Sequence, residues 1–112
     1  MTDDAASDLT LLDVLTAAAE ELPGIRQAEE SSALTWSARG IVFAAVDDQS
    51  AEFRLDPRVV LAALRTTDTK PSARGSDWVA FAPATLDDEA VDRAEAWFLS
   101  AHRRATRPPA PA

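Results

Sequence analysis

The stretch that decides the fold is residues 34–55, LTWSARGIVFAAVDDQSAEFRL. Apolar and polar side chains alternate over 34–38 and again over 51–55, which is the period of strands with one buried face. Between them, residues 41–46 are apolar throughout, as expected of a central strand. The polar connections between these three segments are short, so the stretch predicts an antiparallel meander.

Upstream of the meander the sequence predicts one helix and one weak strand. Ser7 or Asp8 is expected to cap the helix, and Pro23-Gly24 to end it. The weak strand is expected over 25–29. The buried stripe of the helix recurs at three- and four-residue steps and comprises Leu9, Leu12, Leu15, Ala19 and Leu22.

Downstream, Asp56-Pro57 is typical of a helix start, with the aspartate as cap and the proline at the first helical position. A short buried stripe is expected to follow it. Thr66 to Asp77 is predicted to be a polar loop, and Trp78 to Ala82 a buried strand. The stripe of the short helix comprises Val60, Leu61 and Leu64.

The last helix has the strongest signals. Asp87 is expected to cap it, and Leu86 with Val91 to form a hydrophobic staple around that cap. Arg103 and Arg104 stand in the last turn, where the helix dipole favours cations. The expected buried face comprises Val91, Ala94, Trp97, Phe98 and Ala101.

These elements predict an α+β domain in which helices pack against an antiparallel sheet of about five strands, in the order α-β-β-β-β-α-β-α. The expected domain covers 9–106. A disordered acidic lead is expected over 1–8 and a Pro/Ala-rich tail over 107–112.

Composition favours a soluble cytoplasmic protein. The chain has 112 residues, no cysteine and a net charge of −8. The absence of cysteine excludes disulfides and thiolate chemistry, and the acidic start is no signal peptide. No apolar run is long enough to span a bilayer. Arginine outnumbers lysine ten to one, which is typical of a GC-rich bacterial genome.

No residue pattern in the sequence predicts a catalytic, metal or cofactor site. His102 is the only histidine and is expected to serve as a surface or helix-capping cation. The three glycines form no phosphate-binding loop, and the acidic clusters lack calcium-loop spacing. The tryptophans are expected in the core, with a small-ligand pocket around them as an alternative. They are Trp36, Trp78 and Trp97.

Charge is unevenly distributed. Residues 1–30 carry eight acids and one base, whereas residues 54–74 carry five bases and two acids. The acidic part is expected to be a solvated surface, or alternatively a docking surface for a basic partner. The basic part is either scattered solubilising cations or one patch that contacts nucleic acid or a protein. The candidate contact residues are Arg39, Arg54, Arg58, Arg65, Lys70 and Arg74.

Several of these features resemble the MmcQ/YjbR family over about residues 9–105. The residues that carry the resemblance are Trp36, the segment RGIVFA at 39–44, the segment RGSDWV at 74–79 and the closing helix that ends near Ser100. The resemblance implies a frataxin-like (CyaY-like) α+β fold, described as a double wing and associated with DNA binding.

The chain departs from this family pattern at two places. Ile41 replaces the hairpin lysine, and Ser100-Ala101 replaces a Ser-Tyr pair. Losing a cation on a wing disfavours nucleic acid, as does the net charge. We therefore expect a non-enzymatic binding or interaction module, whose partner is either an unidentified protein or DNA, with DNA disfavoured by the net charge. The alternatives are a weak DNA-binding protein and a small-ligand-binding protein.

Overall fold

The computed structural model describes residues 9–47 and 50–108. The predicted lead over 1–8 and the last four residues of the predicted tail lie outside this range. The elements in chain order are α2 (Leu11–Glu20), β1 (Ile25–Glu30), β2 (Ala33–Ala38), β3 (Ile41–Val46), β4 (Ala51–Arg54), α3 (Pro57–Ala63), β5 (Thr69–Pro71), β6 (Trp78–Phe81) and α4 (Asp88–Thr106).

The predicted α+β class is confirmed, but the sheet has six strands rather than about five. The additional strand is β5, which lies inside the segment that we expected to be a polar loop. It contains only three residues, Thr-Lys-Pro, so it is too short to show a period of its own. Its pairing with β6 makes it a strand, and that partner is not apparent from its own sequence.

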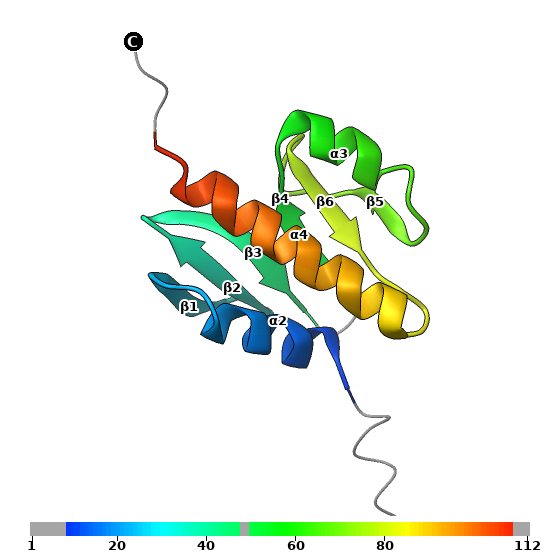
Figure 1. The fold of residues 1–112 in the computed structure, drawn as a ribbon, viewed down its shortest axis with the longest axis horizontal. Helices are drawn as coiled ribbons and strands as arrows, with labels where there is room; N and C mark the ends of the chain where they lie inside the picture. The colour runs from blue at the N-terminus through cyan, green and yellow to red at the C-terminus, as the bar shows by residue number, and fades with distance from the viewer. Residues whose placement is uncertain (1–8, 48–49, 109–112) are drawn as a thin grey trace, which may run out of the picture.

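The sheet is antiparallel in every pairing, with the strand order β1-β2-β3-β4-β6-β5 (Figure 1). The predicted weak strand and the predicted meander form its first four strands. The chain then leaves β4, passes through α3 and β5, and returns with β6 between β4 and β5. The pairing of β4 with β6 extends beyond the strand itself, because the Leu55 N–H donates to the Asp77 carbonyl at 2.8 Å.

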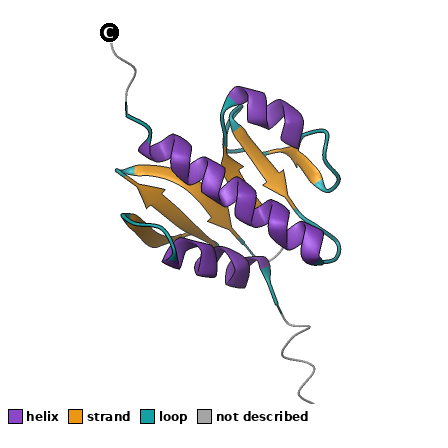
Figure 2. Ribbon diagram, in the orientation of Figure 1, coloured by secondary structure: helices purple, strands orange, loops and turns teal. Residues whose placement is uncertain are grey.

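Helices α2 and α4 pack side by side over one face of the sheet (Figure 2). Directly paired strand residues point to the same side of a sheet. Trp36, Ala44, Phe53 and Val79 form one such row across β2, β3, β4 and β6, and all four are fully buried under the helices. The opposite side of the sheet, here called the open face, carries the alternate row. That row comprises Ala28, Thr35, Ala45, Glu52, Ala80 and Lys70.

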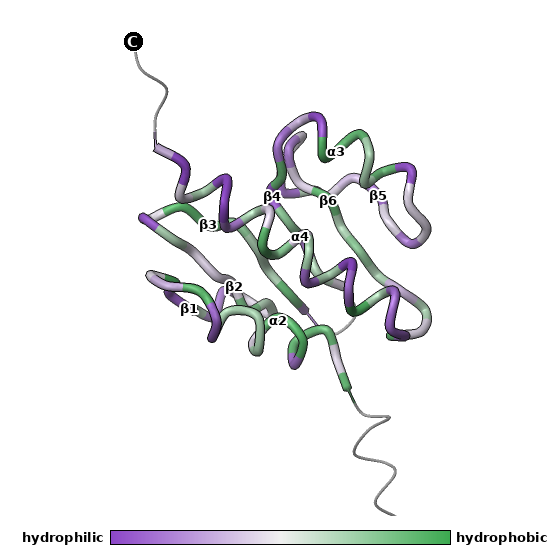
Figure 3. Tube along the Cα trace, in the orientation of Figure 1, coloured by the Kyte–Doolittle hydropathy of each residue, from purple (hydrophilic) through white to green (hydrophobic). Residues whose placement is uncertain are grey.

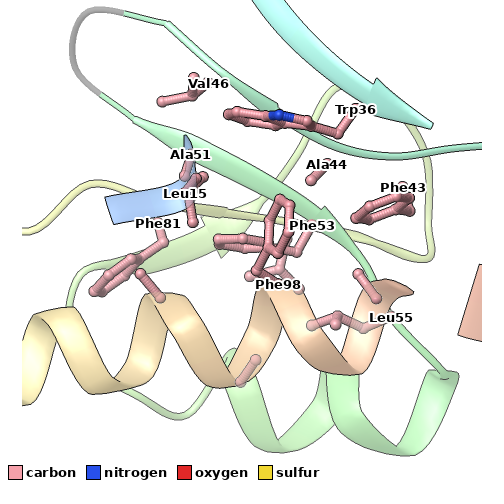
Figure 4. Packing of buried hydrophobic residues seen from close by; sticks show 14 of the residues in the cluster. Leu15, Trp36, Phe43, Ala44, Val46, Ala51, Phe53, Leu55, Phe81 and Phe98 are labelled. Atoms are coloured by element: carbon pink, nitrogen blue, oxygen red, sulfur yellow. The ribbon is translucent and has the colours of Figure 1, made fainter. Parts of the chain in front are cut away.

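The core between sheet and helices is centred on Phe98 of α4 (Figure 4). Its ring meets Trp36 edge-on at a centroid distance of 5.3 Å and Phe43 at 5.2 Å. A register shift between Trp36 and Ser37 leaves Phe43 without a direct partner on β2. A β-bulge changes the direction of a side chain. It explains how Phe43 and its neighbour Ala44, which would otherwise point to opposite sides of the sheet, are both fully buried. Figure 3 shows the hydrophobic trace of β3 lying behind α4.

Two predicted turns are present. Arg39 and Gly40 have φ angles of 56° and 79°, which are the left-handed values that a two-residue hairpin requires. Asp47 and Ser50 close the next connection, because the Ser50 N–H donates to Asp47 Oδ1 at 2.8 Å. Asp48 and Gln49, also expected in that turn, lie outside the described residues.

The predicted start of α2 is wrong. The helix begins at Leu11, and Thr10 caps it in a reciprocal capping box with Asp13 at 3.1 Å. The expected caps Ser7 and Asp8 lie outside the described residues. Leu9 therefore precedes the helix, and it and Leu12 are exposed. Leu15, Ala19 and Leu22 of the predicted stripe lie in or against the core, as expected, and Leu11, Val14 and Ala18 pack there as well.

The other two helices differ in how far they follow the prediction. In α4, Asp87 caps as expected by accepting from the Ala90 N–H at 2.9 Å. In α3, Asp56 stands at the N-cap position but its side chain makes no capping hydrogen bond. Leu61, expected in the buried stripe of α3, is 69% exposed, because α3 is short and buries only Val60 and Ala63.

Candidate interaction surfaces

Arg74 lies over the open face, in contact with Glu52 of β4 and Glu30 of β1. Its Nε donates to Glu52 Oε1 at 2.8 Å, and its Nη1 lies 3.4 Å from Glu30 Oε1. Its guanidinium also stacks 5.3 Å above the centre of the Trp78 ring. Arg74 was predicted as a nucleic-acid or partner contact. In the structure it is ion-paired with Glu52 and Glu30 of the same chain.

The loop that carries Arg74 folds over the open face. Ser72 Oγ donates to Glu52 and accepts from the Arg74 N–H at 3.0 Å. Gly75 lies so close to Trp78 that a Cβ atom there would stand 3.2 Å from Trp78 Cδ1. Burial opposes the charge of Arg74, but its bonds to the carboxylates outweigh this and raise its pKa. The open face is therefore covered near β4 and β6.

A second set of ion pairs joins the end of α4 to the rest of the domain. Arg104 Nε lies 3.2 Å from Asp56 Oδ1, and Arg104 Nη1 lies 3.0 Å from Asp77 Oδ2. Asp77 Oδ2 also accepts a hydrogen bond from Arg54 Nε at 2.9 Å. Arg107 also belongs to this network, because its Nη2 lies 2.8 Å from Asp56 Oδ2. This explains why Asp56 does not cap α3: its carboxylate is bound to two arginines of the C-terminal segment.

Both aspartates of this network have lowered pKa values. For Asp56 the hydrogen bond from Arg107 is the main cause. For Asp77, burial would raise the pKa, and the hydrogen bonds from Arg54 and Arg104 outweigh it. Arg104 was expected only to interact with the helix dipole. Its partners are 27 and 48 residues away in the sequence, so no local pattern indicates them.

The six predicted contact residues therefore do not form one free patch. Arg54 and Arg74 are ion-paired, and Arg39 donates to the Thr106 carbonyl at 3.1 Å. The other three are exposed and lie on α3, just after it and on β5. Within the described part of the chain, no ion pair shorter than 4.0 Å includes them. They are Arg58, Arg65 and Lys70.

His102 is not a surface or capping residue, as the sequence suggested. It is only 7% exposed, and its ring meets Phe43 edge-on at 5.5 Å. Its Nε2 faces the Pro23 carbonyl oxygen at 3.4 Å. His102 lies on the buried stripe of α4 four residues after Phe98, and that spacing was the signal for its position.

Trp36 and Trp78 are buried, in agreement with their predicted core role, and Trp97 is half-buried against the core. Trp36 is fully buried and donates through Nε1 to Gln27 Oε1 at 3.2 Å. Trp97 packs edge-on against Phe81 at 5.2 Å. Trp78 is 8% exposed under the open-face loop. None of them lines either of the two hollows described next.

The surface formed by the described residues includes two sizeable hollows. One, of about 540 Å³, lies between the start of α2, the β1–β2 turn and the end of β3. The other, of about 390 Å³, is a groove between α2 and α4. We call the second the interhelical groove. Its lining residues are Ala17, Ala18, Glu21, Leu22, Glu95, Phe98 and Leu99.

The interhelical groove is apolar inside and acidic at its rim. Leu99 is 40% exposed although it lies beside the buried Phe98. Among the described residues that line it, the charged ones are Glu21 and Glu95. Helix α2 carries no basic residue in its last turn, and the exposed side of α4 adds Asp88 and Asp92 before Glu95. The described residues that line the groove therefore include two acids and no base.

In residues 9–47 and 50–108, no three histidine or acidic side chains gather in a way that would hold a metal ion. None of the helices in that part of the chain combines the length and apolarity needed to cross a membrane.

Comparison with known proteins leaves the family open. The chain matches no protein-family model, no curated protein and no solved structure. Its resemblance to MmcQ/YjbR proteins thus stays a prediction from its motifs.

Proposed function

We propose that this chain is a non-enzymatic cytoplasmic interaction module that binds a basic amphipathic segment of a partner protein in the interhelical groove. The observation that carries the proposal is the combination of an apolar groove floor with a glutamate on each helix, Glu21 on the α2 side and Glu95 on the α4 side. Grooves between helices commonly receive the apolar face of a partner helix.

Charge indicates the chemistry of the partner. The acids around the groove attract cations and repel acidic segments, which sets both the rate of encounter and the register of binding. A helix with leucines on one face and lysines or arginines beside them would fill the groove and pair with its rim. The exposed Leu99 provides the apolar contact at which such a helix would anchor.

The packing of reactive groups supports binding rather than catalysis. His102 is enclosed by Phe43 and the Pro23 carbonyl instead of facing a hollow. The carboxylates with lowered pKa values are held by arginines in the ion-pair network. Arginine pairing keeps those carboxylates ionised, which suits a structural charge better than a general acid.

The test uses a fluorescein-labelled 18-residue Leu/Lys helix, with an acidic Leu/Glu helix and a scrambled Leu/Lys peptide as controls. We expect the chain to bind the amphipathic basic helix and to bind the two controls at least about tenfold more weakly. A variant with Glu21→Lys and Glu95→Lys should lose this preference. Glu89→Lys makes the same charge change on an exposed position of α4 outside the groove and should retain it. Equal binding of the scrambled peptide, or an unchanged double variant, would overturn the proposal.

The second candidate is weak DNA binding, which the double-wing resemblance implies. What supports it is the exposure of Arg58, Arg65 and Lys70 without ion-pair partners among the described residues. The pairing of Arg54 and Arg74 reduces the cations available for it. Membership of the MmcQ/YjbR family is proposed with it, on the motif order alone.

A further inference from the structure

The two edges of the sheet differ in their capacity to pair with another strand. β5 is an edge of three residues that ends in Pro71, which has no N–H to donate. β1 is the other edge, with six residues, of which Arg26 to Glu30 are all exposed. Every second residue of β1 directs its N–H and C=O away from β2. In the described part of the chain, β1 therefore offers a row of hydrogen-bonding groups that no other strand pairs with.

The charges of β1 are complementary to a second copy of the same strand. In a two-fold antiparallel pair, facing residues lie on the same side of the sheet, so a symmetric pair centres on one residue. Centred on Ala28, the pair places Arg26 of each strand opposite Glu30 of the other. The smallest side chain of the five then lies on the two-fold axis, where the strands approach most closely.

Neighbouring registers lack this match. Centring on Glu29 or Glu30 puts two carboxylates face to face, and centring on Arg26 puts two guanidinium groups face to face. Like charges directly opposite one another are destabilising, whereas opposite charges stabilise a strand pair. Centring on Gln27 sets Arg26 against Ala28 and forms no ion pair. The sequence of β1 therefore selects one register for self-pairing.

The other side of the same pair is also complementary. Gln27 accepts the Trp36 Nε1–H through its Oε1, so its Nε2 remains to donate. In the register centred on Ala28, Gln27 faces Glu29 of the second strand. The hydrogen bond from the buried Trp36 thus orients the Gln27 amide so that its Nε2 can donate to the Glu29 carboxylate of the second copy. The exposed Leu12 of α2 lines the larger hollow together with Gln27 and Glu29, so it lies beside these two residues of β1.

We propose that β1 pairs antiparallel with β1 of a second copy, in the register centred on Ala28, and joins two sheets into one. The Arg26–Glu30 pairs lie on the open-face side, where Arg74 already contacts Glu30 at 3.4 Å. Glu30 would then be shared by two arginines, one from each copy. This surface is separate from the interhelical groove and does not depend on the function proposed for that groove.

The experiment is sedimentation velocity of the full chain over a concentration series. We expect a concentration-dependent dimer, and at least about tenfold weaker association for Arg26→Glu alone or Glu30→Arg alone. Mixing these two variants should restore the dimer, because each opposed pair is again of opposite charge. Arg65→Glu is the matched control, since it changes an exposed arginine far from β1, and it should leave association unchanged.

The mixture separates loss of pairing from loss of folding. Glu30→Arg also removes a partner of Arg74, so a lower melting temperature alone could reduce association. Restoration on mixing requires both variants to be folded and to meet in this register. A monomer at millimolar concentration would overturn the proposal. So would a dimer that withstands both single reversals, because it would show that another surface or another partner strand covers the contact.

Discussion

Arg74 and Glu52, 22 residues apart in the sequence, form a 2.8 Å ion pair across the side of the sheet that faces away from α2 and α4. Both side chains are about three quarters covered, with 26% and 22% exposed. The pair fixes the loop between β5 and β6 over β4. It connects the last part of the sheet to its middle.

We predict that Arg74→Ala lowers the free energy of unfolding by about 1–3 kcal/mol, the range for a hydrogen-bonded charged group. Its loss leaves Glu52 without its arginine and uncovers Trp78. Urea unfolding gives the energy, and tryptophan emission should shift to the red. Arg74→Lys should recover little, because an ammonium cannot reproduce the arginine fork. Unchanged emission and stability would show that the loop is held by other contacts.

We predict that His102→Ala destabilises the domain by about 1–3 kcal/mol, because it leaves a cavity beside Phe43. This reverses what the sequence alone suggested, which was a surface residue that tolerates removal. Thermal unfolding measures the effect. Arg103→Ala, on the exposed side of the same turn, is the matched control and should melt close to the unmodified chain. Equal melting of both variants would contradict the buried position.

We predict that Phe98→Ala costs about 3–5 kcal/mol, the range for removing a large core aromatic ring. Its ring contacts both Trp36 and Phe43, so its loss opens the space between α4 and the sheet. Leu61→Ala removes a side chain that is 69% exposed and should change stability by less than about 0.5 kcal/mol. Denaturant midpoints test both. A small effect at Phe98 would mean that the helix is held elsewhere.

We predict that stability falls in acid through Asp56 and Asp77. Their pKa values are lowered in the folded state, so the ionised form favours folding. This contribution is present above the unfolded pKa, about 3.9, and is lost as pH falls through the folded pKa. Asp77→Asn should weaken the acid dependence below about pH 4. Unfolding at a series of pH values measures it, with Asp68→Asn, outside the ion-pair network, as the control.

We predict no sequence-specific DNA binding at physiological salt and only weak binding at low salt. Three exposed cations would give a log–log salt slope of about −3, since each neutralised phosphate contributes about −0.9. Fluorescence anisotropy with labelled duplexes across a salt series tests this. Charge reversal of Arg58, Arg65 and Lys70 together should abolish the low-salt signal. Submicromolar binding that persists at physiological salt would make DNA binding the first candidate function.

What the sequence determined by itself was local. The meander follows from alternation over 34–38 and 51–55 and from the Arg39-Gly40 turn. The cap and buried face of α4 follow from Asp87 and the spacing of Ala94, Phe98 and Ala101. These features depend on residues within a few positions of one another, so a short stretch of sequence is enough to predict them.

Tertiary structure alone decided the strand β5, the burial of Leu11, Val14 and Ala18 on α2, and the placement of the charges. Three residues become a strand at β5 only because β6 lies beside them. Asp56 has the sequence context of a helix cap, yet it pairs with Arg104 and Arg107. The sequence near Arg54 and Arg74 does not indicate their ion-pair partners, which are Asp77 and Glu52. An ion pair depends on distances of a few ångströms between side chains, and only the folded chain sets distances between residues far apart in sequence.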